Sequence, residues 1–207
     1  MNTLPRRRLF AMFAALTITV AACGSEDATP DATADTVPDA ADDATADTVP
    51  EALPEFQGGP DPAIGMDAPA ISGVDYSGQP SSFVPGGGRP TLLVFLAHWC
   101  GHCNAEIPRM IEWDANGGVP DNLDIVGIST LATDTRDKYP PGEWLDETGW
   151  EWPVIADDEE EYRYARLYGL AGTPYLVLVG ADGKVMARTA GEKSAEELTE
   201  FVSPIAG

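Results

Sequence analysis

The stretch Thr91-Leu-Leu-Val-Phe-Leu-Ala-His-Trp-Cys-Gly-His-Cys103 is an apolar run that ends in two cysteines separated by two residues. Residues 92–96 are apolar without alternation, and the run is too short to span a membrane, which predicts a strand buried on both faces of a sheet. The cysteines then lie where this strand gives way to a helix. The unpaired N–H groups and partial positive charge of a helix start favour a thiolate there.

The spacing of the two cysteines predicts a redox pair. Cys100 lies at the expected helix start and is the predicted nucleophile. Cys103 follows one helical turn later, close enough to attack a mixed disulfide formed at Cys100. The pair can therefore cycle between dithiol and disulfide.

The motif Trp99-Cys-Gly-His-Cys103, followed by Pro108 and later by Gly172-Thr173-Pro174 before another apolar run, resembles the thioredoxin superfamily. Over residues 62–204 the likeness is to the membrane-anchored, extracytoplasmic TlpA/ResA-like thiol-disulfide oxidoreductases. It implies an α/β, thioredoxin-like fold: a central mixed β-sheet flanked by helices, with an N-terminal extension. It also implies that the Thr173–Pro174 bond is cis and that its loop lies beside the cysteines and binds extended substrate.

His102 lies between the cysteines, and a protonated imidazole there would stabilise the Cys100 thiolate and lower the pKa of Cys100. The dipeptide Gly101-His102 matches that of protein disulfide isomerase and favours a more oxidising couple than the Gly-Pro of thioredoxin. TlpA/ResA-like proteins are usually reductants, so the direction stays open. Trp99 and Gly101 are typical of an exposed redox turn, and with His102 they are the predicted tuning residues.

The group that takes the proton of Cys103 also stays open. Thioredoxin carries a buried aspartate six residues before its first active cysteine, and Val94 stands in that place here. Glu106, one turn beyond Cys103, is a candidate replacement. The alternative is that Glu106 is a surface residue of the helix.

No metal or cofactor is expected. Structural zinc sites draw ligands from two separated segments, whereas His98 and His102 are the only histidines and both lie near the cysteines. A copper chaperone of the Sco type is also not expected, because it needs a distal histidine and both histidines of this chain lie near the cysteines. Haem attachment requires Cys-x-x-Cys-His, and Asn104 follows the motif here. An inactive structural disulfide and a non-catalytic binding module on the same scaffold remain alternatives.

Residues 1–22 predict a signal peptide, with three arginines, an apolar stretch and small residues before Cys23. Val20-Ala-Ala-Cys23 resembles the bacterial lipobox, which implies that Cys23 is acylated and becomes the mature N-terminus. Its acyl chains would anchor an extracytoplasmic protein to a bacterial membrane, facing the periplasm or the cell surface. An ordinary secreted chain with a free Cys23 is the alternative.

Residues 23–62 predict a lipidated N-terminus followed by a disordered acidic linker. This segment repeats Asp-Ala-Thr-Ala-Asp-Thr-Val-Pro at 31–38 and 43–50, with almost no large apolar residue. Such a sequence cannot bury enough surface to offset the entropy of ordering it. Residues 63–207 are the predicted thioredoxin-like domain.

The net charge of −22 repels phosphate backbones, so no nucleic-acid partner is expected. The expected partners are cysteine-containing protein substrates and a membrane or soluble thiol-disulfide partner that exchanges electrons with the pair. A dedicated apocytochrome c reductant is an alternative within the same chemistry.

Hydrophobic patterning and turn residues predict the remaining elements. A short strand or hairpin is expected within 63–90, and Trp144, Trp150 and Trp152 are expected to pack or to form a substrate surface. The other predicted elements are a helix at 104–113, a strand at 123–129, a helix at 142–148, a strand at 153–156, a helix at 157–168, a hairpin of 175–179 and 185–189 around Asp182-Gly183, and a helix at 194–203.

Overall fold

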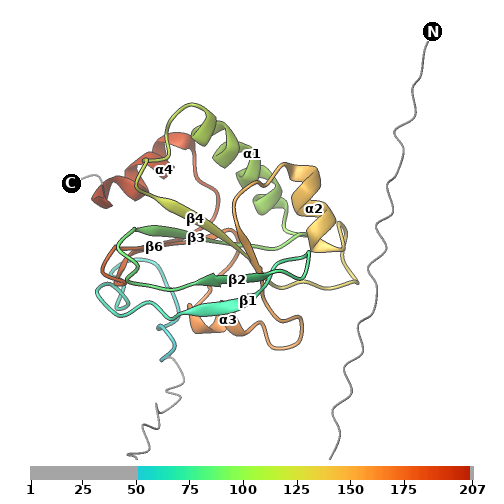
Figure 1. Ribbon diagram of the computed structural model, residues 1–207, viewed down its shortest axis with the longest axis horizontal. Helices are drawn as coiled ribbons and strands as arrows, with labels where there is room; N and C mark the ends of the chain where they lie inside the picture. The colour runs from blue at the N-terminus through green and yellow to red at the C-terminus, as the bar shows by residue number, and fades with distance from the viewer. Residues whose placement is uncertain (1–50, 206–207) are drawn as a thin grey trace, which may run out of the picture. The chain divides into compact units, whose positions relative to one another are not determined.

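The computed structural model describes residues 51–205, drawn in colour in Figure 1. The predicted signal peptide, Cys23 and most of the predicted linker lie outside the described residues. Within 51–205, no helix is both long and apolar enough to cross a membrane.

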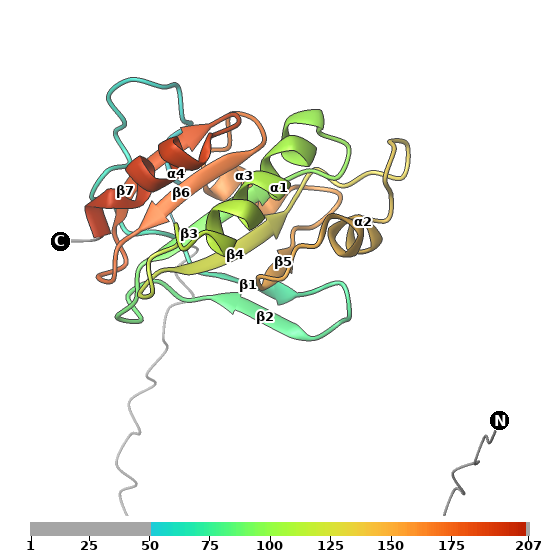
Figure 2. The same ribbon diagram turned by 90° about the horizontal axis from the view of Figure 1, so that it is seen from above.

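Five strands form the central sheet in the order β5-β4-β3-β6-β7 (Figure 2). The central strand β3 pairs in parallel with β4 and antiparallel with β6, so the sheet is mixed, as predicted. The strands are β3 (Thr91–Leu96), β4 (Asp124–Ser129), β5 (Val154–Ala156), β6 (Tyr175–Val179) and β7 (Val185–Ala190).

The apolar run of β3 is buried at all six positions. Leu92, Val94 and Leu96 belong to one core cluster, whereas Leu93 and Phe95 belong to the cluster on the opposite face. Successive side chains of a strand point to opposite faces, so a strand covered on both sides favours apolar residues at successive positions, as at residues 92–96. This arrangement explains the absence of alternation in the sequence.

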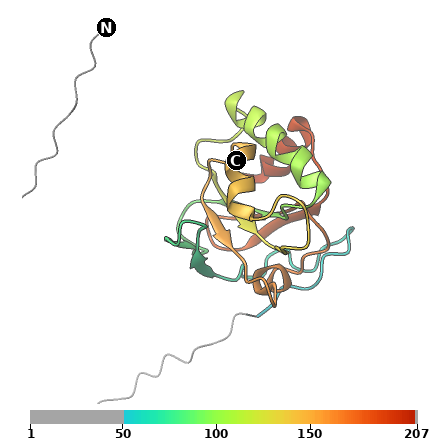
Figure 3. The same ribbon diagram turned by 90° about the vertical axis from the view of Figure 1, so that its right-hand side faces the viewer.

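Helices cover both faces of the sheet, and a separate hairpin adds to one of them (Figures 1 and 3). One face carries α1 (Gly101–Ala115), α2 (Pro141–Thr148) and α4 (Ala195–Val202), which is followed by a short 3₁₀ helix, Ser203–Ile205. The other face carries α3 (Arg163–Leu167) and the hairpin of β1 (Ile71–Val74) and β2 (Pro80–Phe83). The predicted fold, including its N-terminal extension, is therefore confirmed.

The β6–β7 hairpin turns at Asp182-Gly183, as the sequence predicts. Gly183 has a φ of 82°, a left-handed conformation that favours glycine. A Cβ at this position would also lie 2.9 Å from the backbone nitrogen of Gly86. Glycine is therefore required here both by the turn and by the close approach of the loop before β3.

The helix predicted at 194–203 is α4, and Ser194 is its N-cap. Ser194 Oγ accepts a hydrogen bond from the N–H of Glu197, and the Glu197 carboxylate accepts one from the N–H of Ser194. This reciprocal pair satisfies two N–H groups that have no partner within the helix.

The helix predicted at 157–168 is too long, because α3 covers only Arg163–Leu167. The buried Asp157 carboxylate accepts hydrogen bonds from the N–H groups of Tyr164 and Ala165. Asp158 accepts from the N–H groups of Glu161 and Arg163. These carboxylates satisfy backbone donors in place of a preceding helical turn, so the chain turns instead of forming a helix.

The folded part also begins earlier than the boundary predicted at residue 63. Leu53 is buried, and its N–H donates to the carbonyl of Leu167. Asp61 forms an ion pair with Arg188, whose side chain is completely buried. Residues 51–62 therefore pack on the domain and are not part of a free linker, because Leu53 and Asp61 have specific partners there.

Candidate active site

The two cysteines lie at the junction of β3 and α1, with both thiols free. Cys100 is the N-cap of α1 and has an extended backbone, with φ −76° and ψ 118°. It is 7% exposed, whereas Cys103, inside the first turn, is completely buried. Cys100 is therefore the sulfur that a partner can reach, as expected for the nucleophile.

Hydrogen bonds around its sulfur favour the thiolate of Cys100. Burial alone would raise the pKa of Cys100, but hydrogen bonds with the side chain of Thr173 and with Cys103 lower it. The backbone N–H of His102 acts in the same direction. The balance leaves the pKa of Cys100 below its usual value, which increases the thiolate fraction near neutral pH.

Cys103 has the opposite tendency. Burial, its largest cause, raises the pKa of Cys103 to about 12, although a hydrogen bond from the N–H of Ala97 opposes this shift. That N–H lies 3.5 Å from Cys103 Sγ. The nearby Cys100 also raises the pKa of Cys103. Cys103 is thus held as a thiol at neutral pH.

The Thr173–Pro174 loop lies directly against the cysteines. Cys100 Sγ donates to the carbonyl of Thr173 at 3.2 Å, across a separation of 73 positions in the chain. The Thr173–Pro174 peptide bond is cis, as the resemblance implies. The structure therefore brings together the two predicted site segments that lie furthest apart in the domain.

Trp99 and Gly101 flank the nucleophile differently. Trp99 is half-buried, its Nε1 donates to the carbonyl of Leu131 at 2.8 Å, and the Arg136 guanidinium lies 5.0 Å from the centre of its ring. Gly101 is exposed, and a Cβ there would meet no atom within 4 Å. Packing therefore fixes the ring of Trp99 but does not by itself require glycine at 101.

His102 is exposed, with 73% of its side chain accessible. Its Nδ1 lies 2.5 Å from Oε1 of Glu192, in the loop after β7. The other oxygen of Glu192 accepts a hydrogen bond from Arg109 of α1. Glu192 was missed in the sequence, because nothing in an isolated loop glutamate indicates that it will face the redox motif.

Glu106 is completely buried, so the alternative of a surface glutamate is wrong. Its Oε2 accepts from the N–H of Lys193 at 2.8 Å, while its buried Oε1 has no hydrogen-bond partner within the described residues. Burial raises the pKa of Glu106, although the N–H of Lys193 and the charge of Arg109 act against this shift. A buried carboxyl with a raised pKa is a stronger base when ionised than an exposed one.

His98 has a structural role. It is completely buried, its Nε2 accepts from the N–H of Thr133 at 3.2 Å, and its Nδ1 lies 2.7 Å from the carbonyl of Asp137. This network assigns the proton to Nδ1 and leaves no free nitrogen for a metal ion. Across residues 51–205, His, Cys, Asp and Glu side chains form no group of three that could hold a metal.

Asn104 is a second residue that the sequence did not single out. Its Nδ2 donates to the carbonyls of His98 and Cys100, and its Oδ1 accepts from Trp144 Nε1 at 3.0 Å and from Lys138 Nζ. Asn104 therefore ties the first turn of α1 to α2 and to the loop that precedes it.

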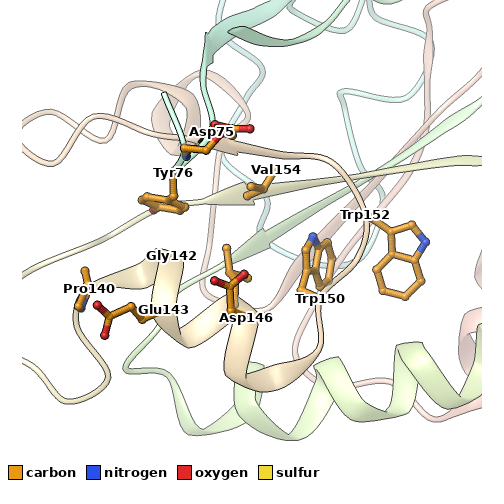
Figure 4. Close-up of a pocket in the computed structure, with 11 residues that line it drawn as sticks. Asp75, Tyr76, Pro140, Gly142, Glu143, Asp146, Trp150, Trp152 and Val154 are labelled. Atoms are coloured by element: carbon orange, nitrogen blue, oxygen red, sulfur yellow. Dashed lines mark hydrogen bonds between the residues drawn. The ribbon is translucent and has the colours of Figure 1, made fainter. Parts of the chain in front are cut away.

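A pocket of about 460 Å³ lies between α2 and the turn after β1 (Figure 4). The rings of Trp150 and Trp152 pack edge to face, with 4.9 Å between their centroids, and both residues line the pocket. Trp144 and Trp150 are buried and Trp152 is half-buried. Packing is thus the main role of these tryptophans, and neither cysteine is among the residues that line the pocket.

Comparison with known proteins gives a consistent set of relatives. A family model described as a thioredoxin-like domain matches residues 83–204. The thiol-disulfide oxidoreductase ResA of Bacillus thuringiensis is 26% identical over 146 residues, which cover 69% of this chain and 78% of that protein. The thiol:disulfide interchange protein HelX of Rhodobacter capsulatus is 26% identical over 149 residues, covering 70% and 78%. A solved structure of a secreted Mycobacterium tuberculosis disulfide oxidoreductase homologous to Escherichia coli DsbE has a TM-score of 0.51 at 26% identity, covering 65% of this chain and 95% of that one.

Proposed function

This chain belongs to the thioredoxin-like domain family and is a distant homologue of thiol-disulfide oxidoreductases of the ResA type, and we propose that it exchanges disulfides with cysteines of extracytoplasmic proteins. The observation that carries the proposal is the asymmetry of the pair Cys100–Cys103. Local hydrogen bonds lower the pKa of the accessible thiol, and burial raises the pKa of the hidden one. An attacking and a resolving cysteine need this difference.

In the reductive direction, the Cys100 thiolate attacks one sulfur of a client disulfide. The client S–S bond breaks, its second sulfur leaves as a thiolate and takes up a proton, and a mixed disulfide joins Cys100 to the client. Thr173 and Pro174 lie beside this sulfur, so their backbone is the proposed guide for an extended client segment.

The second step needs the thiolate of Cys103. Glu106, one turn further along α1, is the proposed acceptor of its proton, because burial raises the pKa of this carboxyl and makes the carboxylate a stronger base. The Cys103 thiolate then attacks the Cys100 sulfur and the mixed disulfide breaks. The client leaves with two more electrons and the protein retains a Cys100–Cys103 disulfide.

A second thiol-disulfide partner must return the pair to its starting state, and the reverse sequence would oxidise a client dithiol. Trp99, Gly101 and His102 are the proposed determinants of which direction prevails.

The secreted relative and the predicted lipobox at Cys23 support an extracytoplasmic location with a lipid anchor. Palmitate labelling of wild-type protein and a Cys23→Ala variant tests the anchor, and equal labelling of the two would contradict it.

The activity is tested with insulin reduction and with refolding of reduced ribonuclease, using wild type and Cys100→Ser. We expect wild type to be active in at least one assay and the variant to lose at least about 100-fold, because the attacking thiolate is gone. Equal behaviour of the two proteins would instead support the non-catalytic binding module.

A redox titration tests the direction of exchange. A midpoint potential of about −270 mV would indicate a reductant, including one dedicated to apocytochrome c. A midpoint potential of about −120 to −200 mV would indicate an oxidant or isomerase.

A further inference from the structure

Glu192 connects the loop after β7 to the exposed side of α1 at two points. Its Oε1 lies 2.5 Å from His102 Nδ1, and its Oε2 accepts from Arg109 Nη1. These contacts join positions 90 and 83 residues apart in the chain. The Glu192 carboxylate thus contacts the imidazole of His102, one of the two residues between the cysteines.

We propose that Glu192 is a positioning residue that binds the His102 imidazole, withholds its positive charge from the Cys100 sulfur, and so makes the pair more reducing than its Gly-His dipeptide alone would. This inference rests on the proposed thiol-disulfide exchange. It offers a physical reason why a motif like that of protein disulfide isomerase can occur in a relative of ResA.

His102 can act on the Cys100 thiolate through two groups, its backbone N–H and its ring. Its backbone N–H forms a hydrogen bond that lowers the pKa of Cys100. Its ring, in contrast, is bound by Glu192, and a charge-assisted hydrogen bond of this kind offsets much of the field of an imidazolium. The pKa of Glu192 lies below its usual value, first because of His102 and then because of Arg109, so the carboxylate is ionised when it makes these contacts.

The loop that carries Glu192 is itself held in place. Lys193 Nζ donates to the carbonyls of Ala190, Gly191 and Glu192 at 3.0–3.2 Å. The N–H of Lys193 donates to Glu106, the proposed proton acceptor. Among these charged groups Glu192 is the one in contact with the imidazole, and Arg109 of α1 pairs with Glu192 and lies 3.8 Å from Glu106.

The test is the redox equilibrium of purified protein with glutathione at about pH 7. Replacing the carboxylate in Glu192→Gln leaves the imidazolium charge uncompensated and the ring free to approach the sulfur. We expect the equilibrium constant to move towards the dithiol by about three- to tenfold, where tenfold corresponds to about 30 mV.

Three further variants separate positioning from a general effect of charge. Glu196→Gln removes an exposed acid from the first turn of α4 and is expected to leave the equilibrium within about twofold of wild type, in keeping with the screening of exposed charges. Glu192→Asp retains the charge and should restore part of the wild-type value. In a His102→Ala background, Glu192→Gln should cause no further shift.

A Glu192→Gln equilibrium within about twofold of wild type, or one moved towards the disulfide, would overturn the inference. So would an equal shift in the His102→Ala background, because the carboxylate would then act without the imidazole. If wild type forms no Cys100–Cys103 disulfide at all, the proposed function fails and takes the inference with it. Quantifying the two thiols by alkylation and mass spectrometry distinguishes these results.

Discussion

At the scale of single residues, Cys103 and Glu106 are two buried acids on the same helix, and burial is the largest cause of a raised pKa at each of them. The raised pKa of Glu106 makes its carboxylate a stronger base, and the raised pKa of Cys103 makes a nearby base necessary for its ionisation. This arrangement lowers stability, because the buried Oε1 of Glu106 has no hydrogen-bond partner among residues 51–205.

Glu106→Gln is expected to slow thiol-disulfide exchange about 100-fold, because Gln cannot accept the proton of Cys103. The same change should raise the midpoint of thermal unfolding at pH 7. The folded state raises the pKa of Glu106, so stabilisation by its bound proton is complete below the unfolded pKa of about 4.3 and is lost as the pH rises through the folded pKa. Stopped-flow kinetics and thermal melts between pH 3 and pH 8 measure both effects.

The matched control is Glu112→Gln, which removes an exposed acid from the same helix. It should change neither the exchange rate nor the pH dependence of stability. A Glu106→Gln protein that exchanges as fast as wild type would contradict the proposed role. A gain in stability that persists unchanged at pH 3 would contradict the pKa argument.

At the scale of elements, β7 is joined to the segment before β1 by a buried charge. The Arg188 side chain is completely buried, pairs with Asp61, and donates to the carbonyls of Pro54 and Tyr168 at 2.8 and 3.1 Å. Removing one partner of such a pair leaves the other charge buried without compensation. The strand therefore depends on a segment that the sequence assigns to the linker.

Asp61→Asn is expected to lower the free energy of unfolding by about 3 kcal/mol, because Arg188 stays buried without its counter-charge. The hydrogen bond from Arg188 lowers the pKa of Asp61, so this stabilisation is present above the unfolded pKa of about 3.9 and is lost as the pH falls through the folded pKa. Urea denaturation at pH 7 and at pH 3 measures the difference, which should be smaller at the lower pH.

Asp67→Asn is the control, because Asp67 forms an exposed ion pair with Lys184 at 2.6 Å. An exposed pair contributes about 0–1 kcal/mol, so this variant should stay close to wild type. Equal losses for the two variants would show that burial of Arg188 does not govern the effect.

At the scale of the whole molecule, residues 51–62 complete the core cluster on the face of the sheet that carries α3. Leu53 belongs to this cluster and Phe56 packs against it. The N–H groups of Leu53 and Phe56 donate to the carbonyls of Leu167 and Gly169, next to α3. The stable unit therefore includes the last part of what the composition alone predicts to be a tether.

A chain that begins at Ala63 is expected to unfold at a lower urea concentration than one that begins at Glu51. It loses both the apolar contacts of Leu53 and the counter-charge of Arg188, so the loss should exceed that of Asp61→Asn. Urea denaturation of the two chains, with residues 24–207 as the reference, measures it. A chain from Ala63 that is as stable as one from Glu51 would contradict the inclusion of this segment in the fold.

The sequence by itself determined the features that depend on neighbours along the chain. The unbroken apolar run of β3 predicts a strand covered on both faces, the cysteine spacing predicts a redox pair at a helix start, and Asp182-Gly183 predicts a hairpin turn. Each of these follows from local backbone geometry or from the periodicity of one element.

Only the tertiary structure decided which side chains from distant segments meet at the site. The proximity of Thr173 to Cys100 could be inferred from a resemblance, but the contact of Glu192 with His102 and the burial of Glu106 beneath Lys193 could not. The shortened α3 and the packing of residues 51–62 were also hidden, because buried carboxylates formed bonds that composition does not reveal. Such contacts depend on how strands cross over and align across the sheet, which no stretch of neighbouring residues specifies.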